Sequence, residues 1–167
     1  MHLDPARSRV AIYTFAEGLF SALAHDLQLV AGDLEGEATS TGAEVQVPAG
    51  SIRVRGVMKR GKLDPSVLSD ADRASIERQI REDVLAGPRL VARGVLQGGR
   101  IGIEIAAPRA TTRIACDLRI DDEDGGKRVT GETAISLAAL GVPPVKGPMG
   151  AFRVKDRVRL EIDLIFR

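Results

Sequence analysis

The sequence lacks several features that mark common classes of binding site. Aromatic residues make up only 3% of the chain and tryptophan is absent, so the apolar positions are mostly aliphatic and suit either an aliphatic guest or a self-filled core. A single cysteine, Cys116, excludes an intramolecular disulfide framework and a cysteine-based zinc ribbon. The 24 basic and 23 acidic residues nearly cancel, which disfavours nucleic acid and anionic membrane surfaces as partners.

Long apolar runs are missing as well. No stretch of apolar residues is long enough for a transmembrane helix, and the opening "MHLDPARSRV" has no apolar core of a secretory signal. We therefore expect a soluble, cytoplasmic protein without stable membrane insertion, or a periplasmic one if a leader has been removed. The 167 residues, 44% of them hydrophobic, suit a single domain spanning residues 1–167.

What the sequence does contain is alternation of apolar and polar residues, the period of a β-strand. In "RVRLEIDLIF" the apolar residues from Val158 to Phe166 share one face, and the charged residues from Arg157 to Asp163 share the other. Further alternating segments cover residues 8–15, 43–56, 89–96, 100–105, 111–120 and 127–137. One apolar and one polar face indicate an all-β, antiparallel fold, and about eight such strands must close into a barrel or double up to hide their edges.

One segment has a helical period instead. Ile76, Ile80 and Val84 recur at spacings of four, and a capping residue at Ser69 precedes them. The spacing predicts one principal amphipathic helix over residues 70–86. We expect its apolar stripe to pack on the sheet, with a mobile lid over a ligand opening as the alternative.

The stretch "GLFSALAHDLQL" contains one of the two histidines and allows several interpretations. Ser21 lies four residues before His25, so a small hydrolase using both is conceivable, but Asp26 would point about 100° away around the same helix and the nucleophile-elbow motif is missing. A metal site would need His2, Asp4, His25 and Asp26 to converge, and we predict none. We expect His25 to mark the turn between the first two strands, with its ring hydrogen-bonded to a backbone group or carboxylate, or to contact a ligand at the barrel mouth.

Two further candidates have ordinary structural explanations. The acidic run "DDEDGGKRVTGE" partly matches a calcium-binding loop, but strand patterns flank it, so a hairpin turn is predicted. Cys116 falls on the apolar face of its segment and is predicted to be a small core residue.

The order of several short motifs resembles the YceI-like family. The segments that carry this resemblance are "LDPARSRVAIYT", "LAHDLQL", "GDLEGEA", "REDVLAGPRLVARG" and "GKRVTGETAISLAALGVPPVKGPMGAFRVKDRVRLEIDLIF". The matching positions are Asp4, Ser8, His25, Gly36, Arg81, Asp83, Leu85, Pro88, Leu140, Gly141, Val142, Gly150, Val154, Asp156 and Val158. The resemblance implies an elongated, lipocalin-like antiparallel barrel with the helix near one end. It also implies binding of a long isoprenoid or similar lipid in an apolar tunnel, without catalysis.

We therefore predict a non-catalytic protein that carries or sequesters a hydrophobic small molecule, with no cofactor and with a homodimer possible. The rival predictions are a structural or interaction protein whose interior is filled by its own side chains, and the hydrolase above. Residues predicted to contact the ligand, in the barrel interior or at its mouth, are Phe20, His25, Ile101, Ile103, Ile114, Leu118, Leu160 and Ile162.

Overall fold

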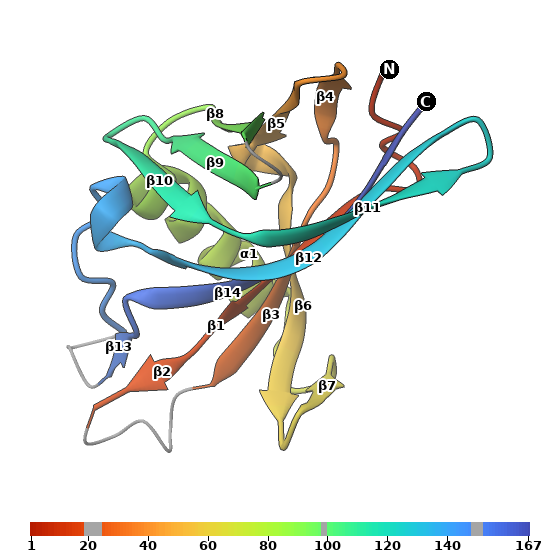
Figure 1. The fold of residues 1–167 in the computed structure, drawn as a ribbon. Helices are drawn as coiled ribbons and strands as arrows, with labels where there is room; N and C mark the ends of the chain where they lie inside the picture. Colours follow the sequence, from red (N-terminus) through yellow and green to blue (C-terminus); the bar gives the residue numbers. More distant parts are fainter. Residues whose placement is uncertain (19–24, 98–99, 148–151) are drawn as a thin grey trace.

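Two antiparallel sheets enclose a common interior in the computed structural model, which describes residues 1–18, 25–97, 100–147 and 152–167 (Figure 1). The seven-stranded sheet contains, in spatial order, β11 (Asp117–Glu123), β12 (Gly126–Ser136), β14 (Arg157–Phe166), β1 (Arg9–Thr14), β3 (Asp26–Ala31), β6 (Ile52–Lys59) and β7 (Lys62–Asp64). The five-stranded sheet contains β10 (Thr111–Ala115), β9 (Arg100–Ala106), β8 (Arg89–Gln97), β5 (Gly42–Pro48) and β4 (Glu35–Ala38). A small sheet at the lower left of Figure 1 pairs β2 (Ala16–Glu17) with β13 (Arg153–Val154).

The alternating segments form strands, and the predicted β-rich class with one principal helix is confirmed. Residues 157–166 form β14, which pairs with β12 on one side and with β1 on the other. In this register Leu160 lies opposite Thr133 and Ile12, so inward positions of neighbouring strands face the same interior. The acidic run forms the predicted hairpin, since β11 ends at Glu123 and β12 begins at Gly126.

The predicted closure into a barrel is wrong, because the hydrogen-bonded ladders of the described strands form two separate sheets. Residues 111–120, expected as one strand, divide at Cys116, so that β10 pairs with β9 while β11 pairs with β12. The chain changes sheets again between β3 and β4, where Asp33 adopts a left-handed φ of 47° that a strand does not accommodate. Alternation predicts which face a side chain takes, but it carries no signal for a strand that leaves its partner.

The first residues of the chain connect the two sheets by backbone hydrogen bonds. On one side, the Ala38 amide at the end of β4 donates to the carbonyl of Met1 (2.8 Å). On the other side, His2 and Arg167, just beyond β14, exchange amide-to-carbonyl hydrogen bonds of 2.6 and 2.8 Å. The N- and C-terminal segments therefore lie side by side, as they do at the top of Figure 1.

The principal helix α1 (Asp70–Gln79) begins at the predicted cap. The Asp72 amide donates to Ser69 Oγ, and the Ser69 amide donates to Asp72 Oδ2, each at 3.1 Å, which completes a capping box. The second half of the predicted helix continues as a π-helical turn, Ile80–Leu85, and ends at Ala86 in a left-handed conformation (φ 50°). None of the described helices has the length and apolar composition needed to cross a bilayer.

Two side chains of α1 attach it to the free edge of β6. The Val54 amide donates to Glu77 Oε1 (2.9 Å), while Arg73 Nη1 donates to the carbonyls of Val54 (3.0 Å) and Arg55 (2.9 Å). Arg73 Nη2 also donates to the Pro65 carbonyl. On this side of β6 the short strand β7 pairs only with residues 57–59, so the helix side chains take the place of a missing strand.

The inward side chains form two buried clusters, one toward the chain termini and one around β9, β12 and the segment after β12. Cys116 belongs to the second cluster, as predicted, and is 8% exposed. Within the first cluster, four residues are buried among other side chains away from any cavity, and we call them the packed cluster: Leu3, Leu34, Ala49 and Val54.

Candidate functional site

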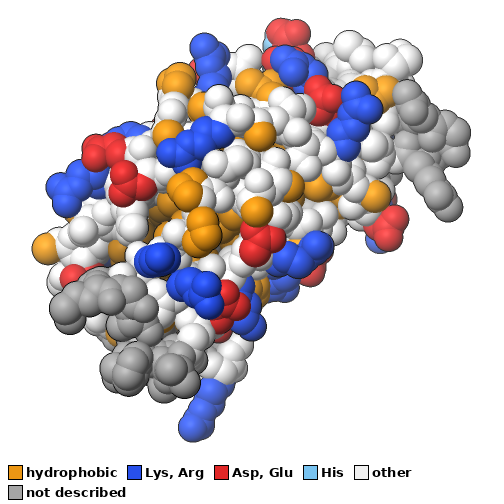
Figure 2. Space-filling view, turned by 90° about the vertical axis from the view of Figure 1, so that its left-hand side faces the viewer, with side chains coloured by type: hydrophobic (Ala, Val, Ile, Leu, Met, Phe, Trp, Pro, Cys, Tyr) orange, Lys and Arg blue, Asp and Glu red, His pale blue; other side chains and the backbone are white. Residues whose placement is uncertain are grey.

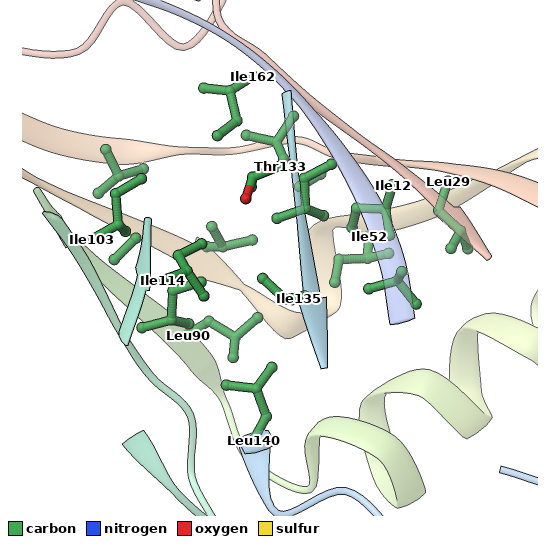
Figure 3. A pocket seen from close by; sticks show the side chains of 18 of the residues that line it. Ile12, Leu29, Ile52, Leu90, Ile103, Ile114, Thr133, Ile135, Leu140 and Ile162 are labelled. Atoms are coloured by element: carbon green, nitrogen blue, oxygen red, sulfur yellow. The ribbon is translucent and has the colours of Figure 1, made fainter. Parts of the chain in front are cut away.

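A cavity of about 1110 Å³ runs between the two sheets. Its wall consists mainly of valine, leucine and isoleucine side chains from both sheets, and Figure 3 shows several of them converging on one space. Binding pockets for small molecules usually measure about 300–1,000 Å³ and are mostly apolar with a few polar groups. The cavity thus has the composition of a ligand site, and its volume is slightly above that range.

Alternation explains why the wall is apolar. On β14, Val158, Leu160, Ile162 and Leu164 line the cavity, whereas the charged residues between them lie on the outer face of the sheet. The inward residues of β9, β10 and β11 contribute in the same way. A predicted antiparallel sheet with one wet face therefore becomes the wall of an apolar chamber.

Most residues singled out from the sequence lie on this wall. The structure places on the cavity Ile101, Ile103, Ile114, Leu118, Leu160 and Ile162, and it places His25 at one end of it. Phe20 lies outside the described residues. Whether any of these side chains contacts a ligand stays a prediction.

The sequence reasoning missed the contributions of β1, β3, β8 and the helix. Ile12, Leu29 and Leu90 line the cavity from the opposite walls, as Figure 3 shows, and Ile76 reaches it from α1. The signal for them was present, because Ile12 and Leu90 occupy inward positions of alternating segments and Ile76 begins the helical stripe. What the sequence lacked was the pairing that places β1 and then β3 next to β14 in one sheet and β8 next to β9 in the other.

Polar side chains reach the cavity in three groups near its rim and at one position inside it. Thr39, Ser40, Thr41 and Lys127 lie toward the chain termini, and Lys127 forms an ion pair with Asp122. Asp72, Ser75 and Gln79 lie on α1, and Thr14, His25 and Lys146 lie at the end near β2 and β13. Thr133 is a polar residue among the aliphatic side chains of Figure 3.

The carboxylate of Asp72 already has hydrogen-bond partners. Its bonds from the Ser69 hydroxyl and amide lower the pKa of Asp72, so this group serves the helix cap.

The outer surface differs from the cavity in composition. Figure 2 shows apolar side chains between charged ones over the middle of one face.

Catalytic and metal arrangements find little support in the geometry. His2 pairs with Glu37 near the chain termini, whereas His25 precedes β3, so the two histidines lie at opposite ends of β1 and do not converge. Among the described residues no three potential metal ligands lie together. Ser21 lies outside the described residues, so the hydrolase hypothesis has no geometry to rest on.

Burial raises the pKa of the Cys116 thiol, whose Sγ donates to the Glu132 carbonyl at 3.4 Å, as expected of an unreactive core cysteine.

The surroundings of His25 differ from the prediction in one respect. It lies, as expected, in the connection that leads into β3, but its ring forms no hydrogen bond with another described residue. The neighbouring carboxylate of Asp26 instead accepts a hydrogen bond from the Ala16 amide at 2.9 Å. The His25 side chain is exposed at the end of the cavity.

The fold is similar to that in the crystal structure of Burkholderia cenocepacia BcnA. The two structures align with a TM-score of 0.68 over 99% of each chain, at 11% sequence identity. At this identity the likeness shows a shared fold alone. No family model matches the chain, and no curated protein matches it.

Proposed function

We propose that this protein binds a long-chain amphiphile, a lipid or an isoprenoid, in the cavity between its sheets. In this proposal it carries or sequesters the molecule and catalyses no reaction. The proposal includes no cofactor, no nucleic-acid partner and no stable insertion into a membrane. That the protein forms a homodimer stays a prediction.

The observation that carries the proposal is the cavity of about 1110 Å³ with an aliphatic wall. Burying a methylene group contributes about 0.8 kcal/mol, so a chamber lined by branched aliphatic side chains favours a flexible hydrocarbon chain. Most polar side chains of the cavity lie near its rim, whereas aliphatic side chains form its wall. This arrangement matches a molecule with a hydrocarbon body and a polar end. The YceI-like resemblance of the sequence agrees with this proposal.

The rival interpretation, a barrel filled by its own side chains, fits this cavity poorly. Protein interiors pack as densely as organic crystals and contain few voids larger than a water molecule. A filled core would bury Leu118, Leu160 and Ile162 completely, yet all three remain partly accessible from the cavity.

A series of straight-chain alcohols tests the proposal. Displacement of the neutral dye Nile red by alcohols of eight to twelve carbons should become about fourfold more effective for each added methylene, since about 0.8 kcal/mol per methylene corresponds to that factor. Native mass spectrometry of protein purified from its own host should show a co-purifying lipid. Absence of saturable dye binding, together with a protein mass free of any adduct, would contradict the proposal.

A further inference from the structure

The end of the cavity near β2 and β13 carries two side chains that can bind an anion. His25 lies directly before β3, and Lys146 lies in the segment before β13, where its backbone pairs with Arg153. Both side chains are exposed and line the cavity together with Phe15, Phe152 and Val154. The apolar wall therefore continues up to the two polar groups.

Neither side chain has an acidic partner. Within the described residues, no carboxylate lies within ion-pair distance of His25 or Lys146. The remaining residues cannot supply one, because residues 19–24, 98–99 and 148–151 contain no aspartate or glutamate.

The carboxylates closest along the chain to this end are already engaged or lie elsewhere on the small sheet. Asp26 accepts a hydrogen bond from the Ala16 amide (2.9 Å), and Asp156 accepts one from the Ala138 amide (2.8 Å). Glu17 lies opposite Arg153 in the β2–β13 pair. None of these three carboxylates lines the cavity. Figure 2 shows Lys and Arg side chains, with Asp and Glu side chains among them, on the lower part of the face where this end lies.

The other two polar groups of the rim have no lysine or arginine without an acidic partner. Lys127 is neutralised by Asp122, and its neighbours on the rim are hydroxyl groups and the N-terminal ammonium of Met1, which donates to the Ala38 carbonyl at 3.0 Å. The helix contributes Asp72, Ser75 and Gln79, which add a carboxylate and neutral groups. Among the described lining residues, a lysine without an acidic partner is thus found at the end with Lys146, whereas the ammonium of Met1 at the other end donates to a backbone carbonyl.

We infer that the bound amphiphile has an anionic head, a phosphate or a carboxylate, and that this head lies beside Lys146 and His25 while the tail extends along the apolar wall. This inference rests on the proposed function. An ammonium group offers three donors to phosphate or carboxylate oxygens, and hydrogen bonds to ionised groups are about twice as strong as those between neutral groups. An alcohol or amide head would leave the charge of Lys146 without a partner.

Competition between dodecyl phosphate, dodecanoate and dodecanol for the Nile red site tests the inference, below the concentrations at which the anions form micelles. We expect each anion to displace the dye at about a tenfold lower concentration than the alcohol in 20 mM salt. That ratio should fall as salt is raised, because the charges are solvent-exposed. Comparing the two anions distinguishes a phosphate head from a carboxylate head.

The double variant Lys146→Gln, His25→Gln should bring the ratio close to one, because the concentration at which the anions displace the dye rises toward that of dodecanol. Lys127→Gln, at the other end of the cavity, is the matched control and should keep the wild-type ratio. Equal displacement by anion and alcohol in the wild type, or a ratio that survives the double variant, would overturn the inference while leaving the proposed function intact. Failure of all three compounds to displace the dye would instead reject the proposed function.

Discussion

Leu34 and Leu160 are both apolar residues that turn inward, yet their surroundings differ. Leu34 belongs to the packed cluster and is 2% exposed, with side chains of both sheets around it. Leu160, on the central strand β14, faces the cavity and remains partly accessible. The sequence shows only that both residues are apolar, and it says nothing of what lies across from either side chain.

On the outer face of the seven-stranded sheet, a network of polar contacts connects the strands that form part of the cavity wall. The Tyr13 hydroxyl donates to Glu161 Oε2 and accepts a hydrogen bond from Gln28 Nε2, both at 2.8 Å. The guanidinium of Arg159 lies over the Tyr13 ring, 4.2 Å from its centre. These contacts connect β1, β3 and β14, and the inward side chains of the same three strands line the cavity.

The largest effect is expected in the packed cluster. Leu34→Ala should lower the free energy of unfolding by about 2–5 kcal/mol, because it removes buried methyl groups and leaves a cavity. Leu160→Ala, the matched control, should cost less than about 2 kcal/mol, since its side chain already borders a cavity and no new one forms. Urea unfolding of both variants measures the difference. Equal losses would mean that the wall is as tightly packed as the cluster.

A smaller loss is expected on the outer face. Tyr13→Phe removes the hydroxyl that connects Glu161 and Gln28 and should cost about 1 kcal/mol, the usual size of such a hydrogen bond. The same change in a Glu161→Ala background should cost clearly less, because half of the network is then already lost. An unchanged cost in that background would show that Tyr13 acts through packing alone.

The pH dependence of stability gives a third test. Arg128 Nε and Nη2 donate to the two carboxylate oxygens of Asp163, each at 2.8 Å, and these bonds hold the pKa of Asp163 below its ordinary value. A carboxyl whose pKa is lower in the folded state stabilises the protein above its unfolded value of about 3.9, and this contribution is lost as the pH falls through the folded value.

Asp163→Asn should therefore remove part of the loss of stability seen on acidification below about pH 4, by under about 1 kcal/mol because the pair is partly exposed. Arg128→Gln should reduce the same part of the acid profile. Unfolding free energies measured at several pH values report both, and identical acid profiles for wild type and variants would contradict the assignment.

The smallest change in stability is expected inside the cavity. Leu118→Trp adds bulk where the wall borders open space, so the free energy of unfolding should change by less than about 1 kcal/mol, against about 1–3 kcal/mol for overpacking a filled core. Nile red binding should nevertheless be lost, because the indole occupies ligand volume. A lower melting temperature with no dye bound by either protein would favour the filled-core alternative.

Much of the fold could be predicted because alternation is a local property. Residues 157–166 form one strand with the predicted bounds, and the hairpin at Asp124 and Gly125 follows from its turn residues. The break at Cys116 could not be predicted, because the apolar face continues unbroken through it while the pairing partner changes from β9 to β12. The strand Asp26–Ala31 was not predicted, although its residues alternate, because it is short and directly follows the stretch that was examined for His25.

The candidate site could also be predicted only in those features that depend on local sequence. Ile101, Leu118 and Ile162 could be placed on an inward face from the sequence, because that needs only the period of two. The open volume in front of them depends on how far apart the sheets stand, which no single segment encodes. Lys146 drew no attention in the sequence, since an isolated lysine has no pattern, and only the fold brings it to the same end of the cavity as His25.

The attachment of α1 to β6 has a consequence for self-association. An uncovered strand edge is a template on which a second molecule can add a strand, the first step toward aggregation. Arg73 and Glu77 occupy the backbone donor and acceptors of Val54 and Arg55 that such a molecule would need. We therefore expect α1 to block strand addition at this edge through the side chains of Arg73 and Glu77.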